Sequence, residues 1–412
     1  MSAVDVQEAI TRAHHGEWAR VVAALTRRFG DLDIAEEAAA EAFATAVERW
    51  TADGVPPNPG GWLTTTANRR AIDRIRRESK RDDKHKEARM VYDDDPPEPL
   101  GAIDDERLRL IFTCCHPALA TQTRVALTLR MVGGLTVPEI ARAFLVQESA
   151  VGQRITRAKA KIKSAGIPYR VPAAEDLPAR VSGVLAVLYL VFNEGYLATG
   201  PDTDPVRHDL TAEAIRLTRL IRVLLPDDGE VAGLLALMLL TEARRTARVS
   251  ARGELVTLNE QDRGAWDAAM IVEGHRLVRE RLATGMAPGR YQILAAINAV
   301  HTSARDARDT DWSQIAALYD QLVRLDPSPI VALNRAIAVA ELDGPDVALA
   351  AVDRLVDDLD GYHAYHATRA DLLRRLGRSQ ESRAAYDRAI ALAGNTAETA
   401  YLTRRRDQLA IE

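Results

Sequence analysis

The sequence has few aromatic residues, few cysteines and no long uninterrupted apolar segment. Phe, Trp and Tyr make up 5% of its 412 residues, whereas Ala, Leu and Arg are abundant; this composition favours an all-helical chain. The two cysteines, Cys114 and Cys115, are adjacent, which excludes a disulfide framework and indicates a reducing compartment. Because no apolar run reaches about 18 residues, no transmembrane helix is expected.

The N-terminal residues Met-Ser-Ala-Val-Asp lack the basic and apolar regions of a signal peptide, so we expect a cytoplasmic protein. The length suits two or three domains, and 47% hydrophobic with 27% charged residues is typical of a soluble globular chain. The net charge of −5 does not by itself predict a polyanionic partner. The charge is segregated, however: residues 69–89 contain ten Lys/Arg and five Asp/Glu, and residues 93–106 contain seven Asp/Glu.

Residues 134–163 have the pattern of a helix-turn-helix. Thr136 is a candidate N-cap, with Pro138 and Glu139 in the first turn. The second helix carries an apolar stripe formed by Val151, Ile155, Ala158 and Ile162. Between residues 152 and 163 there are five Lys/Arg and no Asp/Glu. A helix with such a basic outer face is suited to the DNA major groove; an αα-hairpin with a solvated basic face is the alternative.

Residues 34–50 predict a helix with an acidic outer face. We expect Asp33 to cap it, with Glu36, Glu37 and Glu41 pointing outward; a merely solvated surface is the alternative. A loop rich in Pro and Gly follows at residues 51–61. The next helix, residues 62–77, leaves a polar and basic face outside. That face is formed by Asn68, Arg69, Asp73, Arg74, Arg76 and Arg77.

Three segments, residues 33–43, 58–63 and 67–77, resemble region 2 of a sigma factor of the ECF (sigma-24-like) class. The resemblance implies that the first segment docks on the β′ clamp helices of RNA polymerase and that the last reads and opens the −10 element. The helix-turn-helix resembles region 4, which binds the −35 element and the β flap. The resemblance covers about residues 8–165, and its motifs occur in the family's order.

The resemblance implies a set of site residues. Those expected at the polymerase are Asp33, Glu36, Glu37 and Glu41. Those expected at the −10 element are Trp62, Asn68, Arg69, Asp73, Arg74, Arg76 and Arg77. Those expected at the −35 element are Ser149, Ala150, Gln153, Arg154, Arg157, Lys159 and Lys161. The arginines would contact phosphates, and residues 56–61 with Trp62 would hold an unstacked base; Trp62 as a buried core anchor is the alternative.

Two local features depart from simple expectations. Cys114, Cys115 and His116 invite a metal interpretation, but neighbouring helix positions diverge by about 100°, so we expect packing instead. Leu145 stands where most region 4 sequences have a turn glycine, and Gly152 lies inside the recognition helix, where it costs about 0.5–1 kcal/mol relative to Ala. These features, with residues 113–119 and 153–159, resemble the subgroup of ECF sigma factors that carry a long tetratricopeptide-like extension (the ECF42 group).

The chain after residue 175 is expected to be helical throughout. Residues 181–192 form a nearly all-apolar helix, and Ala336, Ala348, Val352 and Leu355 recur 34 residues later as Ala370, Ser382, Tyr386 and Ala389. A 34-residue period is a tetratricopeptide signature. Polar residues near the apolar helices suit either helix capping or a small-molecule or peptide pocket. They are Asn193, Glu194, Arg207, His208, Asp209, Glu242, Arg244, Arg245, Gln261, Asp262 and Arg263.

These observations predict an all-α chain with four parts: region 2 at residues 1–80, a linker at 81–104, region 4 at 105–168, and an extension at 175–412 whose repeats are clearest at 310–395. We expect a transcription initiation factor that binds core RNA polymerase and promoter DNA, with the extension as regulator through an intramolecular or protein partner. No enzymatic activity, cofactor, metal or membrane association is expected. The alternative is a stand-alone helix-turn-helix regulator whose repeats sense a peptide or metabolite.

Overall fold

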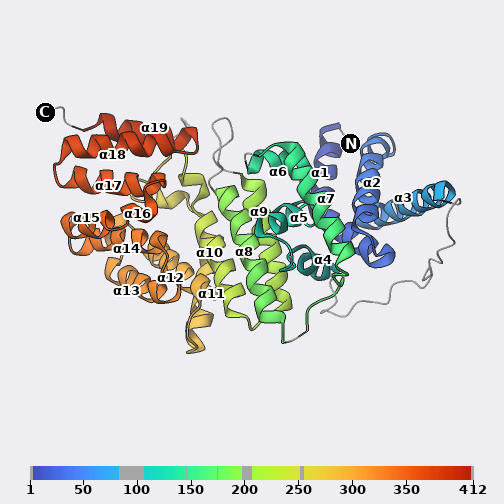
Figure 1. Ribbon diagram of the computed structural model, residues 1–412, viewed down its shortest axis with the longest axis horizontal. Coiled ribbons are helices and arrows are strands. Elements are labelled where there is room, and N and C mark those ends of the chain that lie inside the picture. Colours follow the sequence, from blue (N-terminus) through green and yellow to red (C-terminus); the bar gives the residue numbers. More distant parts are fainter. Residues whose placement is uncertain are drawn as a thin grey trace. The chain divides into compact units, whose positions relative to one another are not determined.

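The computed structural model describes residues 3–82, 106–144, 146–173, 175–196, 207–250 and 255–409. Within these ranges the chain consists of α-helices with short 3-10 turns and no strand, as the composition predicts (Figure 1). Most of the expected linker, and Leu145, lie outside the described residues. The chain divides into two compact units, Met1–Val191 and Phe192–Glu412.

The first unit begins with three long helices, α1 (Ala3–Phe29), α2 (Leu32–Asp53) and α3 (Pro59–Asp82). The prediction that Asp33 caps α2 is wrong. Asp31 is the N-cap, and its Oδ1 accepts from the backbone N–H groups of Asp33 (2.8 Å) and Ile34 (3.2 Å). Helix α1 ends at Phe29, and Gly30 follows with a φ of +66°. This turn places Asp31 at the N-cap of α2. The side chain of Asp33 therefore lies in the first turn of α2, free to make a tertiary contact.

Four shorter helices follow in the same unit: α4 (Glu106–Cys114), α5 (Thr121–Met131), α6 (Val137–Ala143) and α7 (Glu148–Ser164). The predicted cap of the helix-turn-helix is confirmed, because Thr136 N donates to Glu139 Oε2 (2.7 Å) and Glu139 N donates to Thr136 Oγ1 (3.3 Å). The predicted inner stripe of α7 is also confirmed. Val151, Ile155, Ala158 and Ile162 are all buried.

The two groups of helices in the first unit pack against each other. Trp18 Nε1 on α1 donates to the carbonyl of Arg130 on α5 (3.2 Å), and the Arg130 guanidinium lies 5.5 Å from the Trp18 ring centroid. Arg27 on α1 pairs with Glu106 on α4 (2.9 Å). The Tyr169 hydroxyl lies within hydrogen-bond distance of the carbonyls of Ala23 (3.0 Å) and Glu106 (3.1 Å) and shares its proton between them. These contacts join the segments that resemble region 2 and region 4 into one body.

Helix α8 (Leu177–Tyr196) crosses the division between the two units. Among the described helices, α8 is long and apolar enough to cross a membrane by length and composition alone. The sequence expectation concerned an uninterrupted apolar run of about 18 residues, and α8 does not contain one because Arg180 and Glu194 interrupt it. The buried core helix of a soluble protein passes the same test, and Val184, Leu185, Val187 and Leu188 on α8 are each at most 1% exposed.

The second unit continues with helices to the last described residues. They are α9 (His208–Leu224), α10 (Gly229–Glu242), α11 (Ala268–Ala283), α12 (Arg290–Ser303), α13 (Trp312–Leu325), α14 (Pro329–Leu342), α15 (Pro345–Asp353), α16 (Val356–Leu359), α17 (His363–Arg375), α18 (Ser379–Leu392) and α19 (Thr396–Asp407). Every residue of α10 from Val231 to Glu242 is buried. Helices α17 and α18 begin 34 residues after α14 and α15, respectively.

The 34-residue spacing extends to side-chain contacts. Ala336, Ala348 and Val352 and their counterparts Ala370, Ser382 and Tyr386 are all buried in one cluster or beside it. Arg335 pairs with Asp320 (2.6 Å), and Arg369, 34 residues later, pairs with Asp353 (2.7 Å). Equivalent positions of the two helical pairs are therefore buried alike, as expected of stacked helical pairs.

Candidate nucleic-acid and polymerase interface

An open hollow of about 640 Å³ lies between the end of α2 and the start of α3. Its walls include Pro56 and Pro57 from the connecting loop, the indole rings of Trp50 and Trp62, and Arg69. The two rings meet edge to face with centroids 5.5 Å apart. Trp50 is fully buried and anchors the wall, whereas Trp62 is half-buried. Trp62 therefore packs on Trp50 and also lines the hollow.

The basic face of α3 divides into exposed and paired residues. Arg69, Asp73, Arg76 and Arg77 are exposed. Arg74, by contrast, pairs with Glu37 on α2. The half-buried side chain of Asn68 has a fully buried Oδ1 atom without a hydrogen-bond donor among the described residues. Of these exposed residues, Arg69 and Asp73 line the hollow, whereas Arg76 and Arg77 lie further along α3 and outside it.

On α7 the structure separates the predicted DNA-facing residues into two groups. Ser149, Ala150, Gln153, Arg157 and Lys161 are exposed, and Arg154 is half-buried. Lys161 Nζ donates to the carbonyl of Ala118 (2.5 Å). The exposed group lies opposite the buried stripe, as a recognition surface requires.

Lys159 does not lie on that outer face, so this part of the prediction is wrong. Lys159 is 9% exposed, and its Nζ pairs with Asp33 Oδ1 (2.8 Å) and with Glu36 on α2. The physical reason is helical spacing, because Lys159 follows Val151 and Ile155 at four-residue intervals and shares their inward face. The same spacing in the sequence is the signal that could have identified it.

All four carboxylates predicted to contact polymerase are already ion-paired. Asp33 and Glu36 pair with Lys159, Glu37 pairs with Arg74, and Glu41 Oε2 lies 3.8 Å from Arg70 Nε. Arg70 also donates to Thr45 Oγ1 (3.1 Å). The partners of Glu37 and Glu41 come from α3, but those of Asp33 and Glu36 come from the helix-turn-helix part of the unit.

The prediction that Glu36 points outward is wrong, because Glu36 lies buried at the centre of the contact between α2 and the helix-turn-helix part. Its side chain is 11% exposed, and Oε1 accepts from Arg130 Nε at 2.5 Å while Oε2 accepts from Lys159. Burial raises the pKa of Glu36, but the adjacent Lys159 and Arg130 charges outweigh burial and hold it below its usual range. Nearby, Lys163 Nζ donates to Asp31 Oδ2 (2.9 Å). Sequence reasoning missed Arg130 and Asp31 because nothing local marks two residues about 100 positions apart as partners.

The two cysteines are packing residues. Cys114 and Cys115 are 0% and 2% exposed, and Cys115 Sγ lies 3.3 Å from Thr128 Oγ1. Burial raises the pKa of the Cys115 thiol to about 11. In the part of the chain that the structure describes, no cluster of His, Cys, Asp and Glu has the geometry of a metal site.

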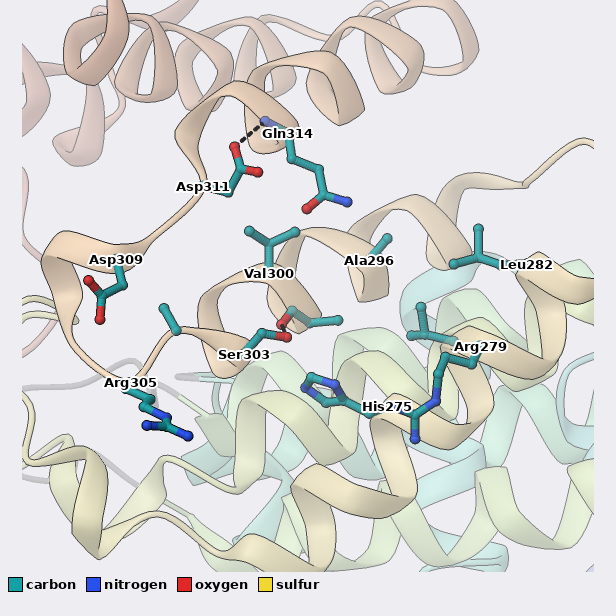
Figure 2. Close-up of a pocket in the computed structure, with 13 residues that line it drawn as sticks. His275, Arg279, Leu282, Ala296, Val300, Ser303, Arg305, Asp309, Asp311 and Gln314 are labelled. Carbon is teal, nitrogen blue, oxygen red and sulfur yellow. Dashed lines mark hydrogen bonds between the residues drawn. The ribbon is translucent and has the colours of Figure 1, made fainter.

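The second unit has a hollow of about 510 Å³ between α11, α12 and α13 (Figure 2). Its polar side chains already serve the fold. His275 Nε2 lies 2.8 Å from Thr302 Oγ1, and Asp311 caps α13 by accepting from Gln314 N (2.9 Å), the bond drawn at the top of Figure 2. Burial lowers the pKa of His275. This hollow therefore holds no assembled nucleophile and base.

Comparisons with known proteins agree with this arrangement. The Sigma-70 region 2 family model matches residues 17–81, the Sigma-70 region 4 model matches residues 109–162, and a family of unknown function (DUF6596) matches residues 180–282. The ECF RNA polymerase sigma factor SigK of Mycobacterium ulcerans (strain Agy99) is 29% identical over 143 residues, 33% of this chain and 74% of the relative. SigK of Mycobacterium tuberculosis (strain ATCC 25618 / H37Rv) is 29% identical over 152 residues, 35% and 79% of the two chains.

No solved structure matches the chain. An uncharacterized protein of Rhizobium meliloti (strain 1021) is 46% identical over 400 residues, 95% of this chain and 94% of that protein. The chain therefore belongs to the same family as the Rhizobium meliloti protein, and its sigma-70 regions 2 and 4, together with the SigK relatives, support an ECF-type sigma factor.

Proposed function

We propose that this sigma factor docks on the β′ clamp helices of core RNA polymerase through α2 and directs the enzyme to promoters. The observation that carries the proposal is one compact unit holding both an arginine-bordered aromatic hollow on α2–α3 and an exposed recognition face on α7. Sigma factor families bind core polymerase and promoter DNA and are not themselves enzymes. The polymerase supplies the catalysis, and this chain supplies promoter recognition.

In this proposal the hollow beside Trp62 receives an unstacked base of the −10 element. A flipped base needs an aromatic face to stack on and a rigid wall to hold it, which Trp62 and the Pro56–Pro57 loop provide. Arg69, Arg76 and Arg77 neutralise the flanking phosphates. Gln153, Arg154 and Arg157 read base edges of the −35 element in the major groove, while Lys161 contacts its backbone and the β flap holds region 4.

We further propose that this arrangement of the first unit is a closed form. Asp33 and Glu36, which would contact the clamp helices, are held by Lys159 and Arg130. Docking on polymerase requires these pairs to exchange for pairs with the partner. The closed form therefore competes with core binding, and its stability sets how much free sigma factor is competent to bind.

The extension is proposed as a tetratricopeptide-like regulatory domain of the ECF42 type that acts through a partner. Support comes from the 34-residue spacing of α14–α15 and α17–α18 and from the repeated Arg–Asp pairs. Covalent attachment to the sigma regions would give the extension the role that a separate anti-sigma protein has elsewhere. A cytoplasmic location follows from the proposed partner, core polymerase.

Co-elution of the full chain with core RNA polymerase, followed by promoter-specific run-off transcription, tests the proposal. The expected result is a stable complex and a transcript that depends on both promoter elements. Sequence-specific DNA binding by the chain alone, with no core complex and no transcript, would instead identify a stand-alone helix-turn-helix regulator and contradict the proposal.

A further inference from the structure

A cavity in the second unit is lined by two buried arginines. Its volume is about 330 Å³, and its wall includes Arg244 and Arg248 from the segment after α10, His363 on α17, Glu398 on α19, and the apolar side chain of Leu402. A cavity of this size is at the lower end of the range of small-molecule sites. Neither the sigma-70 regions nor the promoter elements involve this part of the chain.

Both arginines are buried, and neither forms an ion pair with a carboxylate of the described residues. Arg244 is 8% exposed; its Nη2 donates to Asn298 Oδ1 (3.0 Å), and its Nε is a fully buried donor that has no acceptor among the described residues. Arg248 is 6% exposed; its Nη1 donates to the carbonyl of Tyr196 (2.5 Å). The acceptors are therefore neutral, and Arg244 Nε is the buried donor that remains for a further acceptor.

The nearby carboxylates are paired with other groups. Glu398 accepts from Asn395 Nδ2 (3.0 Å) and lies 3.1 Å from His363 Nε2. Glu242 pairs with Arg245 (3.0 Å) and contacts His208 (3.0 Å). The cavity wall thus carries positive charge that the described residues do not compensate by an ion pair. Burial lowers the pKa of Arg248, and this effect outweighs the opposing charges of Glu242 and Glu398.

We propose that this cavity binds a small organic oxyanion, a carboxylate or phosphate ester, between Arg244 and Arg248. The Arg248 guanidinium lies 3.3 Å from the Tyr196 ring centroid, and this stacking fixes the plane of its donors. A fixed guanidinium plane suits a two-point hydrogen bond to an oxyanion. Leu255, Leu258 and Leu402 supply an apolar wall for a short carbon skeleton. This inference does not rest on the proposed promoter function.

Titration of the full chain at constant ionic strength tests the site. The probes are inorganic phosphate, phenyl phosphate, succinate and benzoate, with chloride and the neutral analogues succinamide and benzamide as controls. Calorimetry gives the dissociation constant. The melting temperature shows whether the ligand binds the folded state and stabilises it. At least one oxyanion is expected to bind saturably and raise the melting temperature by about 5 °C at a hundredfold excess over its dissociation constant, whereas the neutral analogues do not. Comparison of the two phosphate probes with the two carboxylate probes shows which kind of oxyanion the cavity binds.

Three variants assign that binding to the cavity. Arg244→Gln and Arg248→Gln each remove one charge and are expected to weaken binding by at least about tenfold. Ala364→Leu keeps both arginines but fills the cavity from α17, and is expected to weaken binding similarly. Arg335→Gln removes an exposed arginine of the same unit that lies outside the cavity and should bind like the parent chain.

Two results would overturn the proposal. One is the absence of saturable binding by all four oxyanions. The other is binding that persists unchanged in both folded Arg→Gln variants, or in folded Ala364→Leu should the arginine variants fail to fold, because the anion would then sit elsewhere. Circular dichroism and the melting curve of each variant establish whether it is folded before its affinity is compared.

Discussion

Lys159 Nζ on α7 lies 2.8 Å from Asp33 Oδ1 on α2, and it also pairs with the buried carboxylate of Glu36. The two helices come from parts of the chain about 120 residues apart. One belongs to the segment matched by sigma-70 region 2 and the other to the segment matched by region 4. The basic helix proposed to read DNA therefore neutralises the acidic helix proposed to dock on polymerase.

The Lys159→Met variant should bind core RNA polymerase more tightly. Removing the Lys159 cation leaves Asp33 without its partner and weakens the contact between α2 and α7. Less free energy is then needed to open the closed form before docking. Couplings of this kind are typically worth about 1–3 kcal/mol, or roughly 5–150-fold in affinity. Titration of labelled core enzyme measures the change. Arg157→Met on the exposed face of α7 is the matched control and should not alter core affinity in the absence of DNA. Equal affinities for all three chains would argue against a closed form that competes with docking.

Acid should weaken the contact between α2 and α7 through Glu36. Its pKa in the folded chain is held below the usual range, so its contribution to stability is fully present above the ordinary glutamate pKa of about 4.3. That contribution is lost as the pH falls through the lowered value. At neutral pH, Glu36→Gln should cost about 3 kcal/mol because it leaves Lys159 and Arg130 partly unpaired.

The measurement is urea unfolding of the parent chain and of Glu36→Gln between pH 7 and pH 3. The difference in unfolding free energy should shrink toward the acid end, with little change between pH 7 and pH 5. A difference that stays constant down to pH 3 would mean that the Glu36 carboxylate is not stabilised by its two cations.

Two glycines of the helix-turn-helix should respond to alanine with opposite signs. Gly134 has a φ of +73°, and a Cβ there would lie 2.8 Å from His14 and 2.9 Å from Trp18 on α1. Gly134→Ala should lower stability by about 1–3 kcal/mol. Gly152 is helical with open space around it, so Gly152→Ala should raise stability by about 0.5–1 kcal/mol. Thermal unfolding of the two variants checks both signs, and a loss of stability in both would contradict the account of Gly152.

The aromatic wall of the hollow should be required for promoter opening. Base–aromatic stacking is worth about 1–3 kcal/mol, so Trp62→Ala should reduce open complexes by roughly 5–150-fold, whereas Trp62→Phe retains a stacking face. Permanganate reactivity of −10 thymines measures opening. If Trp62 only anchors the core, the loss of opening in both variants should instead follow the loss of folded protein in their melting curves.

The recognition face of α7 should be needed only at promoters that have a −35 element. Arg154→Ala is expected to lower transcription from such a promoter. If Arg154 contacts a phosphate, the slope of log affinity for a −35 probe against log salt concentration should also fall by about one. Loss of affinity for one base pair alone indicates a base contact. A promoter without the −35 element serves as the control. Unchanged transcription together with unchanged protection of the probe would remove Arg154 from the interface.

Local sequence patterns were sufficient to predict much of the first unit. The Thr136–Glu139 cap and the buried stripe from Val151 to Ile162 are each specified within about ten residues. The loop predicted at residues 51–61 is shorter in the structure, because α2 ends at Asp53 and α3 begins at Pro59. Helical periodicity and capping act over one or two turns, so a single sequence exposes them. Asp33 shows the limit of this reasoning, because Asp31 and Asp33 are both good caps and Gly30 decides between them.

The sequence by itself determined an all-α chain with sigma-like regions 2 and 4 and a 34-residue spacing near its end. Only the tertiary structure decided that Lys159 and Arg130 meet at Glu36, and that Arg244 and Arg248 line one cavity with His363 and Glu398. The physical reason is that local sequence predicts a charged residue to be exposed to solvent, whereas its burial depends on a segment distant in the sequence. Burial then makes its pairing, or the lack of it, the strongest electrostatic feature of the site.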